Sequence, residues 1–451
     1  MTQLALASLR RRGGGPVASF LSVFLGTAIV VAFGSMLDTG LRPGTPGGDR
    51  TTLLIIATVV GGWGALIVAS AVATTVAVTA RQRSRELALL RSAGATPDQV
   101  TALITREMAV VAGLGSLLAL PLGYGGGRVL LLALQATHQV SQRTHFAFGA
   151  AAVAIGLAVG MVVAVAATRI TARRAARRRV VDALFDAAAG GRRMGRRRFW
   201  AGLICLGFGI ESVVMSQTMV SGKDVYDVQM IASEACIFAG IGFALLAPLL
   251  LGWAIRLLGP ALRAVSGVSG VLALAGIRQR IQQAATPLMP IIVVTSIATG
   301  TLYMQAITNS LHARADDKSV DMLNYVIVAM ISVFAAVMLV NLLAATLSDR
   351  RQEFAQQRLV GATPRQVLAM VGAEDGLLLV VGLAFGTVGA LLTVVPFSIK
   401  TTHRVIPNAS IGIYLAVVAV VAGLTVGTSL LATWRATRTD AIGELHEAAW
   451  Q

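Results

Sequence analysis

The sequence predicts an all-α polytopic membrane protein with about ten transmembrane helices. Of its 451 residues, 55% are hydrophobic and 13% are charged, which leaves too little polar surface for a soluble chain of this length. The charges gather in short tracts between apolar runs. Ten of these runs are long enough to cross a hydrocarbon core that needs about twenty apolar residues.

The expected spans are 17–36, 53–80, 108–135, 147–168, 199–220, 232–255, 287–307, 322–347, 370–396 and 411–434. The first expected span follows three arginines, Arg10 to Arg12, and a positive stretch before an apolar run is also typical of a signal peptide. This span is about twenty residues long and no small-residue cleavage site obviously follows, so we interpret it as a retained span.

A stretch that occurs twice predicts the organisation of the chain. Residues 83–100 read RSRELALLRSAGATPDQV, residues 350–367 read RRQEFAQQRLVGATPRQV, and ten of the eighteen aligned positions are identical. A second echo, LALASLRRR from Leu4 and LALAGIRQR from Leu272, has nearly the same offset. We therefore expect two parallel four-span repeats, 1–185 and 268–451, on either side of two further spans in 186–267.

The distribution of arginine predicts the orientation, because short loops rich in Lys and Arg stay in the cytoplasm. With the N-terminus inside, 29 arginines fall in cytoplasmic segments, and five arginines and three lysines (Lys223, Lys318, Lys400) fall outside. Ten spans then place the C-terminus in the cytoplasm too. The net charge of +17 is interpreted as a topology signal with attraction to anionic lipids. Nucleic-acid binding is disfavoured because no soluble domain remains to present the charge.

The repeated element predicts a helix, a sharp turn and a new helix. Gly94 suits the left-handed position that ends a helix, Thr96 suits an N-cap, and Pro97 suits the first helical position. Gln99 completes a capping box with Thr96. The same holds for Gly361, Thr363, Pro364 and Gln366. A well-capped connector preserved only by duplication is the alternative interpretation.

The pattern R-x-x-E-x-A-x-x-R-x-x-G-A-T-P-x-Q-V resembles the signature of FtsX-like permease domains, the membrane subunits of MacB-type ABC exporters. In both repeats it follows one long span and precedes another that is led by Glu107 or Glu374. Two such domains separated by two spans also resemble the ten-span permeases of bacitracin-efflux type. Those permeases carry a large extracellular domain, whereas the loops here are short.

The resemblance implies that each repeated segment docks on an ATPase subunit. It assigns ATPase coupling to Arg83, Glu86, Arg91, Gly94, Ala95, Thr96 and Pro97, and to Arg350, Glu353, Arg358, Gly361, Ala362, Thr363 and Pro364. The ATPase, with its ATP and Mg, must be another chain. None of the three lysines stands in a G-x-x-x-x-G-K-[ST] frame, so this chain forms no P-loop and is not itself an enzyme. Two docking segments imply two ATPase copies.

Ionisable residues within spans are the candidates for substrate contact, because a charge in hydrocarbon is costly. Glu211 is the deepest, with Glu234 and Arg128 nearer the outer ends of their spans. Glu211 either binds a cationic substrate, pairs with Arg128, or is satisfied by neighbouring Ser or Gln side chains. The five histidines predict no metal site, and Cys205 and Cys236 lie too far apart in depth for a disulfide.

The sequence thus predicts a plasma-membrane permease that exports, or extracts from the membrane, an amphipathic or hydrophobic compound such as an antimicrobial, peptide or lipid. One alternative is a force-transmitting or sensing protein that acts on a cell-wall hydrolase or a sensor kinase. Another is proton-coupled secondary transport, for which the parallel rather than inverted repeats are unfavourable.

Overall fold

The computed structural model describes residues 15–62, 65, 69, 72, 94–136, 140–176, 194–218, 225–311, 339, 354, 356–357, 359–405 and 409–438. Every regular element within these residues is a helix, which confirms the all-α prediction. Eight helices in this part of the chain are long and apolar enough to cross a membrane. The expected spans 53–80 and 322–347 lie largely outside the described residues. The helices divide between two compact units, which are described separately.

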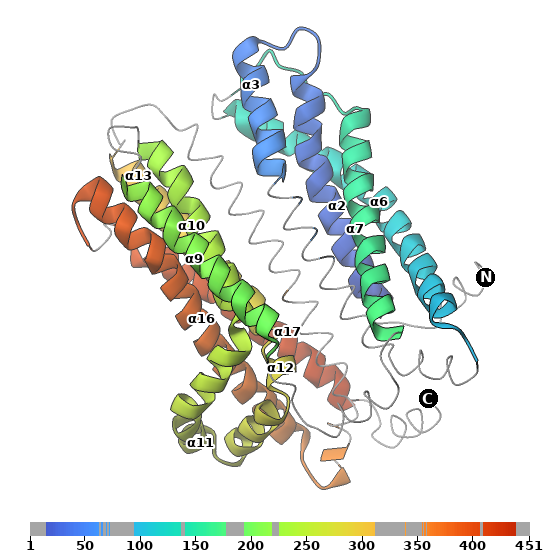
Figure 1. Ribbon diagram of the computed structural model, residues 1–451, viewed down its shortest axis with the longest axis vertical. Coiled ribbons are helices and arrows are strands. Elements are labelled where there is room, and N and C mark those ends of the chain that lie inside the picture. The colour runs from blue at the N-terminus through green and yellow to red at the C-terminus, as the bar shows by residue number, and fades with distance from the viewer. Residues whose placement is uncertain are drawn as a thin grey trace. The chain divides into compact units, whose positions relative to one another are not determined.

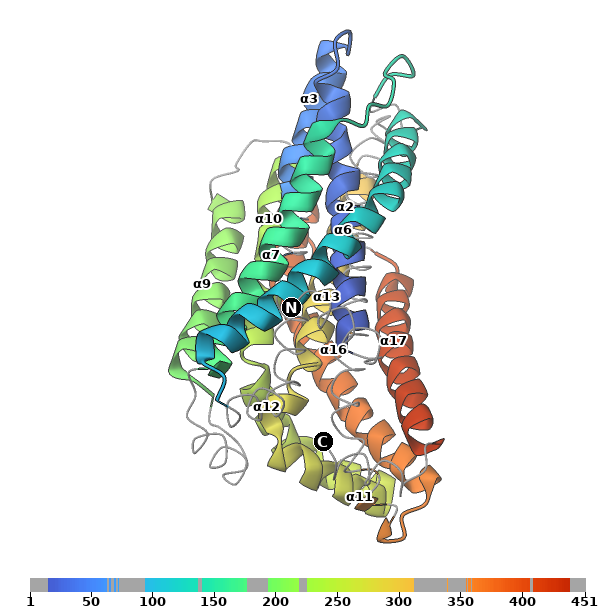
Figure 2. The ribbon, with the colours of Figure 1, turned by 90° about the vertical axis from the view of Figure 1, so that its right-hand side faces the viewer.

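The first unit is built on three long helices. They are α2 (Gly15–Gly40), α6 (Pro97–Ala136) and α7 (Ala150–Ala176), with α3 (Gly47–Ile55) and the π-helical turn η1 (Ile56–Val60) beside α2. Val23 and Val30 of α2 pack with Met108 and Ala112 of α6 and Ala164 of α7. Figures 1 and 2 show α2 running beside both α6 and α7. We call the end of this unit near Gly94 the turn end and the opposite end the far end.

Glycines let the helices of the first unit approach closely. A β-carbon at Gly123 of α6 would lie 2.5 Å from Cγ1 of Val31 on α2, and one at Gly127 would collide with Ser35. Gly156 of α7 faces the same Val31. Gly125, by contrast, faces open space. Small residues at a helix interface are a general means of packing in membranes, where lipid offers little hydrophobic drive for association.

The far end of the first unit is tied together by two aspartates. Asp38 at the end of α2 accepts hydrogen bonds from the backbone N–H groups of Gly149 and Ala152, both at 2.9 Å, and so caps α7. Asp49 of α3 accepts from Ser141 N at 3.1 Å, and from Ser141 Oγ and Thr144 Oγ1, both at 2.6 Å. These hydrogen bonds attach Ser141, Thr144 and the start of α7 to the ends of α2 and α3.

Asp49→Asn is expected to weaken this network in a pH-dependent way. Burial raises the pKa of Asp49, but the hydrogen bonds from Ser141 and Thr144 outweigh it and leave the pKa below its ordinary 3.8. Stability from a lowered pKa is present above the ordinary value and is lost as the pH falls below it. We expect Asp49→Asn to cost about 1 kcal/mol at pH 7, which is less than the roughly 1.5–3 kcal/mol of a charged hydrogen bond because the site is partly exposed.

Thermal unfolding of the purified protein at pH 7 and at pH 3 measures this effect. The difference in Tm between wild type and variant should shrink at the lower pH. A difference that is unchanged at pH 3 would show that the Asp49 carboxylate is not the source of the stability.

The second unit contains α9 (Arg196–Thr218), α10 (Val225–Leu245), α11 (Ala247–Gln279), α12 (Ile281–Ala284), α13 (Leu288–Leu311), α16 (Pro364–Thr402) and α17 (Ile411–Arg438). In this unit α13 packs along α10, α16 and α17. Its largest core cluster joins Leu251 and Ile255 of α11, Leu288 and Ile292 of α13, and Leu378 of α16. Figure 1 shows α11 beside the lower part of α16.

The region of the sixth expected span, 232–255, differs from the prediction. One helix ends at Leu245 and a second begins at Ala247, with Leu246 between them and Pro248 in the first turn of α11. Proline lacks the N–H that would continue the first helix, so the break falls just before it. Helix α11 continues to Gln279 and bends at Gly267, whose φ of 53° is left-handed. Its two halves pack on each other through Gly259 and Leu274.

Candidate functional site

The turn before α16 has the capped geometry that the sequence predicted. Gly361 has a φ of 103°, which a residue with a side chain rarely adopts. Thr363 is the N-cap: its hydroxyl accepts from Gln366 N at 3.3 Å, and the Gln366 side chain accepts from Thr363 N at 2.8 Å. Pro364 occupies the first turn of the helix. Both partners of the capping box are thus in place.

The turn before α6 repeats this geometry. Gly94 has a φ of 95°. Gln99 N donates to Thr96 Oγ1 at 3.3 Å, and Thr96 N donates to Gln99 Oε1 at 3.0 Å. Pro97 begins α6. The other assigned coupling residues lie outside the described residues: Arg83, Glu86, Arg91, Arg350, Glu353 and Arg358.

The tip of the second turn presents apolar side chains to solvent, which sequence reasoning missed. Val360 is 91% exposed and Leu359 is 58% exposed. Gly361, Thr363, Pro364 and Arg365 beside them are also exposed. Exposed apolar residues rimmed by polar ones are typical of protein interaction sites. The corresponding residues of the first repeat are Ser92 and Ala93, so the two tips differ in chemistry.

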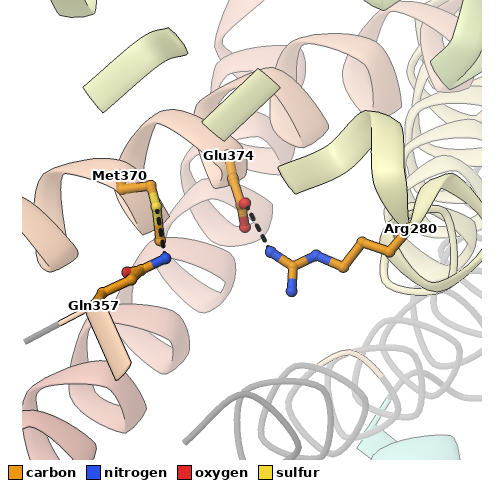
Figure 3. A network of polar contacts seen from close by, with 4 residues as sticks. All are labelled: Arg280, Gln357, Met370 and Glu374. Carbon is orange, nitrogen blue, oxygen red and sulfur yellow. Dashed lines mark hydrogen bonds and ion pairs between the residues drawn. The ribbon is translucent and has the colours of Figure 1, made fainter. Parts of the chain in front are cut away.

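A buried apolar cluster, which we call the base of the second turn, lies behind this turn. Phe354, which is 1% exposed, packs against Val367 and Met370 of α16 and Ala273 of α11. Figure 3 shows Arg280 extending from the end of α11 to Glu374 on α16, with the Gln357 side chain directed at Met370. The Arg280 Nη2 to Glu374 Oε1 distance is 3.2 Å, and the Gln357 Nε2 to Met370 Sδ distance is 3.8 Å. Glu374 is buried, so this ion pair fixes the start of α16 to the end of α11.

The residue types of this ion pair recur in the first repeat. Arg280 closes the echo LALAGIRQR, and Arg12 closes LALASLRRR. Glu374 corresponds to Glu107, which is also buried. The recurrence of an arginine and a glutamate at these positions is the sequence signal from which such an ion pair could have been predicted. The base of the first turn contains Val100 and Ile104 of α6 with Ala172 of α7, and Ala95 packs against them.

The three charged residues expected in spans are all exposed. Arg128 lies on α6, Glu211 on α9 and Glu234 on α10. Arg128 and Glu211 belong to different units, so their pairing stays a prediction. Ser212, next to Glu211, donates to the carbonyl of Phe208 instead of to the carboxylate. A substrate role for Glu211 and Glu234 likewise stays a prediction.

Comparison with protein families matches the FtsX-like permease C-terminal domain twice, over residues 58–180 and 325–441. Together these segments cover more than half of the chain, and each contains one of the glycine turns. The chain belongs to the FtsX-like permease family. Comparison with curated proteins found no match.

FtsX-like permeases are membrane subunits of ABC-type transporters. They lack ATPase activity themselves and generally pair with an ABC ATPase. This protein is accordingly a multi-pass FtsX-like permease with a duplicated domain. Within its described residues, no group of three or more His, Cys, Asp or Glu side chains is placed to hold a metal ion. Cys205 and Cys236 are free thiols, as expected from their depths.

Proposed function

We propose that this permease uses ATP hydrolysed by a separate ATPase to export an amphipathic or hydrophobic compound or to extract it from the membrane. The two glycine turns are the docking segments. The observation that supports this proposal is an exposed, doubly capped turn at the same place in both repeats, set on a buried base. A flexible connector would need neither a capping box nor a left-handed glycine. In this proposal the turns and both chain termini face the cytoplasm, at the plasma membrane.

The helices that follow the turns support transmission of force. Helix α16 has 39 residues, which at 1.5 Å per residue is roughly 58 Å, and α6 is of similar length. Because each turn lies immediately before the first residue of such a helix, a displacement at the turn moves the far end without an intervening loop. ATP-driven closure of an ATPase dimer would move both turns, which implies two ATPase copies per permease.

The exposed surfaces of the protein support the proposed substrate class. The spans expose large apolar side chains along their lengths, and the described loops at the far end of the first unit are short. Amphipathic or hydrophobic molecules that are already dissolved in the membrane fit such a surface. Antimicrobials, peptides and lipids are the members of this class. Glu211 and Glu234 are the candidates for contact with a cationic substrate of this class.

Val360→Asp is expected to weaken binding of the ATPase at least about tenfold, a loss of roughly 1.4 kcal/mol. Val360 is the most exposed apolar side chain at the turn, and a carboxylate would be desolvated without a partner in an apolar contact. Co-purification of the tagged permease with its ATPase and stimulation of ATP hydrolysis measure the loss.

Val405→Asp is the matched control for this experiment. Val405 follows the opposite end of α16 and is 64% exposed, so the same charge is added to the same type of residue away from the turn. Its ATPase binding should equal that of wild type. Equal binding by both variants and wild type would contradict docking at the second turn.

A further inference from the structure

Arg128 lies on an exposed apolar face of α6. Leu122, Val129 and Leu132 are exposed apolar residues near it along this helix, and Val129 is 65% exposed. Arg128 is the one charged residue in the sequence between Glu107 and Arg143. An arginine on a surface that contacts lipid is costly unless a counter-charge meets it.

The position of Arg128 along α6 matches the boundary of a bilayer. The apolar stretch of α6 begins at Met108, directly after Arg106 and Glu107. Twenty residues of helix separate Met108 from Arg128, a rise of about 30 Å, which is about the thickness of a hydrocarbon core. When one end of this stretch lies at one lipid interface, Arg128 lies at the headgroups of the other.

Aromatic rings and a second arginine meet at Tyr124 and the segment 146–148, at the end of this apolar stretch. Tyr124 stands one helical turn before Arg128, on the same side of α6. The Tyr124 ring packs edge-on against Phe146 at a centroid distance of 5.3 Å and against Phe148 at 5.4 Å. Arg42 Nη1 approaches the carbonyl of Phe146 at 3.5 Å. We call Arg42, Tyr124, Arg128, Phe146 and Phe148 the far-end cluster.

Among the residues that the structure describes, no acidic side chain forms an ion pair with the two arginines of this cluster, Arg42 and Arg128. The nearby acids are engaged elsewhere: Asp38 accepts from the backbone at the start of α7, and Asp49 accepts from Ser141 and Thr144. Both guanidinium groups therefore offer free donors to an anion from outside.

The second repeat lacks this arrangement. At the offset of the glycine turns, Leu391 stands in place of Tyr124 and Val395 in place of Arg128. The nearby cation Lys400 is satisfied within the protein, because its Nζ donates to the carbonyls of Ser216 at 2.8 Å and Gln217 at 2.6 Å. Tyr124 and Arg128 thus have no counterparts of their type in the second repeat, so this pair of residues is not a by-product of duplication.

We propose that the far-end cluster binds the headgroup phosphate of an anionic phospholipid. Guanidinium groups form strong paired hydrogen bonds with phosphate. Aromatic side chains favour the region between headgroups and acyl chains, which is where the Tyr124 and Phe148 rings would lie. The apolar face of α6 below Arg128 then contacts the acyl chains. This inference adds a lipid ligand to the permease and does not depend on ATPase docking.

Binding of a short-chain phosphatidylglycerol to the purified permease tests this proposal, by native mass spectrometry or titration at physiological salt. We expect Arg128→Gln to reduce the affinity at least about tenfold, as loss of one charge-assisted pair predicts. Arg128→Lys should retain part of the binding, and Arg42→Gln should lower it less. Arg50→Gln is the matched control, because Arg50 is an exposed arginine at the same end, on α3 and outside the cluster.

The ligands distinguish the source of the phosphate. Phosphatidylcholine should bind more weakly than phosphatidylglycerol, and glycerol phosphate without acyl chains should compete only weakly. Equal losses in Arg128→Gln and Arg50→Gln would overturn the proposal, since they would indicate only general charge attraction. Competition by free glycerol phosphate at the affinity of the lipid would overturn the assignment to a lipid. Size-exclusion profiles identical to wild type establish that the exposed substitutions leave the fold intact.

Discussion

Gly123→Leu is expected to abolish accumulation of folded permease. A β-carbon at this position would lie 2.5 Å from Cγ1 and 2.7 Å from Cβ of Val31, and 3.1 Å from the carbonyl oxygen of Ala28. Val31 is a β-branched residue of α2, so neither its side chain nor the α2 backbone can move aside easily, and α6 must move away from α2. Overpacking in well-packed cores costs about 1–3 kcal/mol or more, and separation of α2 from α6 adds the loss of their contacts. Expression as a fluorescent fusion, followed by size-exclusion chromatography, measures the effect.

Gly125→Leu is the matched control. Gly125 stands two residues further along the same helix, and a β-carbon there meets nothing within 4 Å. Both substitutions change helix propensity equally, so only packing separates them. The control should accumulate and elute as wild type does. If both variants were lost to the same degree, the flexibility of glycine rather than close helix packing would be the requirement.

Arg280→Met is expected to destabilise the second unit and to impair coupling to the ATPase. The change removes the guanidinium group that pairs with the buried carboxylate of Glu374, and removal of one member of a buried ion pair costs up to roughly 3–5 kcal/mol. The start of α16 loses its attachment to α11, so displacement of the turn would be transmitted poorly. We expect a lower Tm and a loss of ATPase stimulation that exceeds the loss of ATPase binding.

Two further variants separate the ion pair from general effects. Arg278→Met changes an exposed arginine on the same helix and should leave both Tm and stimulation near wild type. The double variant Arg280→Met with Glu374→Met removes both charges and should recover part of the lost Tm, since the buried carboxylate is removed together with its guanidinium partner. Equal stability of Arg280→Met and Arg278→Met would contradict a structural role for the Arg280–Glu374 pair.

Local sequence was sufficient for the glycine turns and for most of the helices. The capping box joins residues three apart, as in Thr363 and Gln366, and a left-handed glycine needs no distant partner. Both follow from the rules of helix ends. Seven of the eight helices that are long and apolar enough to span a membrane lie where the sequence predicted spans, and the eighth, Ala247–Gln279, lies mostly between two of them. The break at Leu246 was missed because Pro248 lies within a run that is apolar throughout.

Contacts between distant segments required the tertiary structure. Arg280 and Glu374 are 94 residues apart, and their pairing depends on how α11 packs on α16. The difference between Gly123 and Gly125 depends on which side of α6 faces α2. In an apolar helix, all sides have nearly the same hydrophobicity, so the sequence carries no periodic signal that orients it. Composition and local capping therefore determined most of the membrane helices and the turns, whereas helix packing decided which charges are paired, as Arg280 and Glu374 are, and which, like Arg128, are exposed.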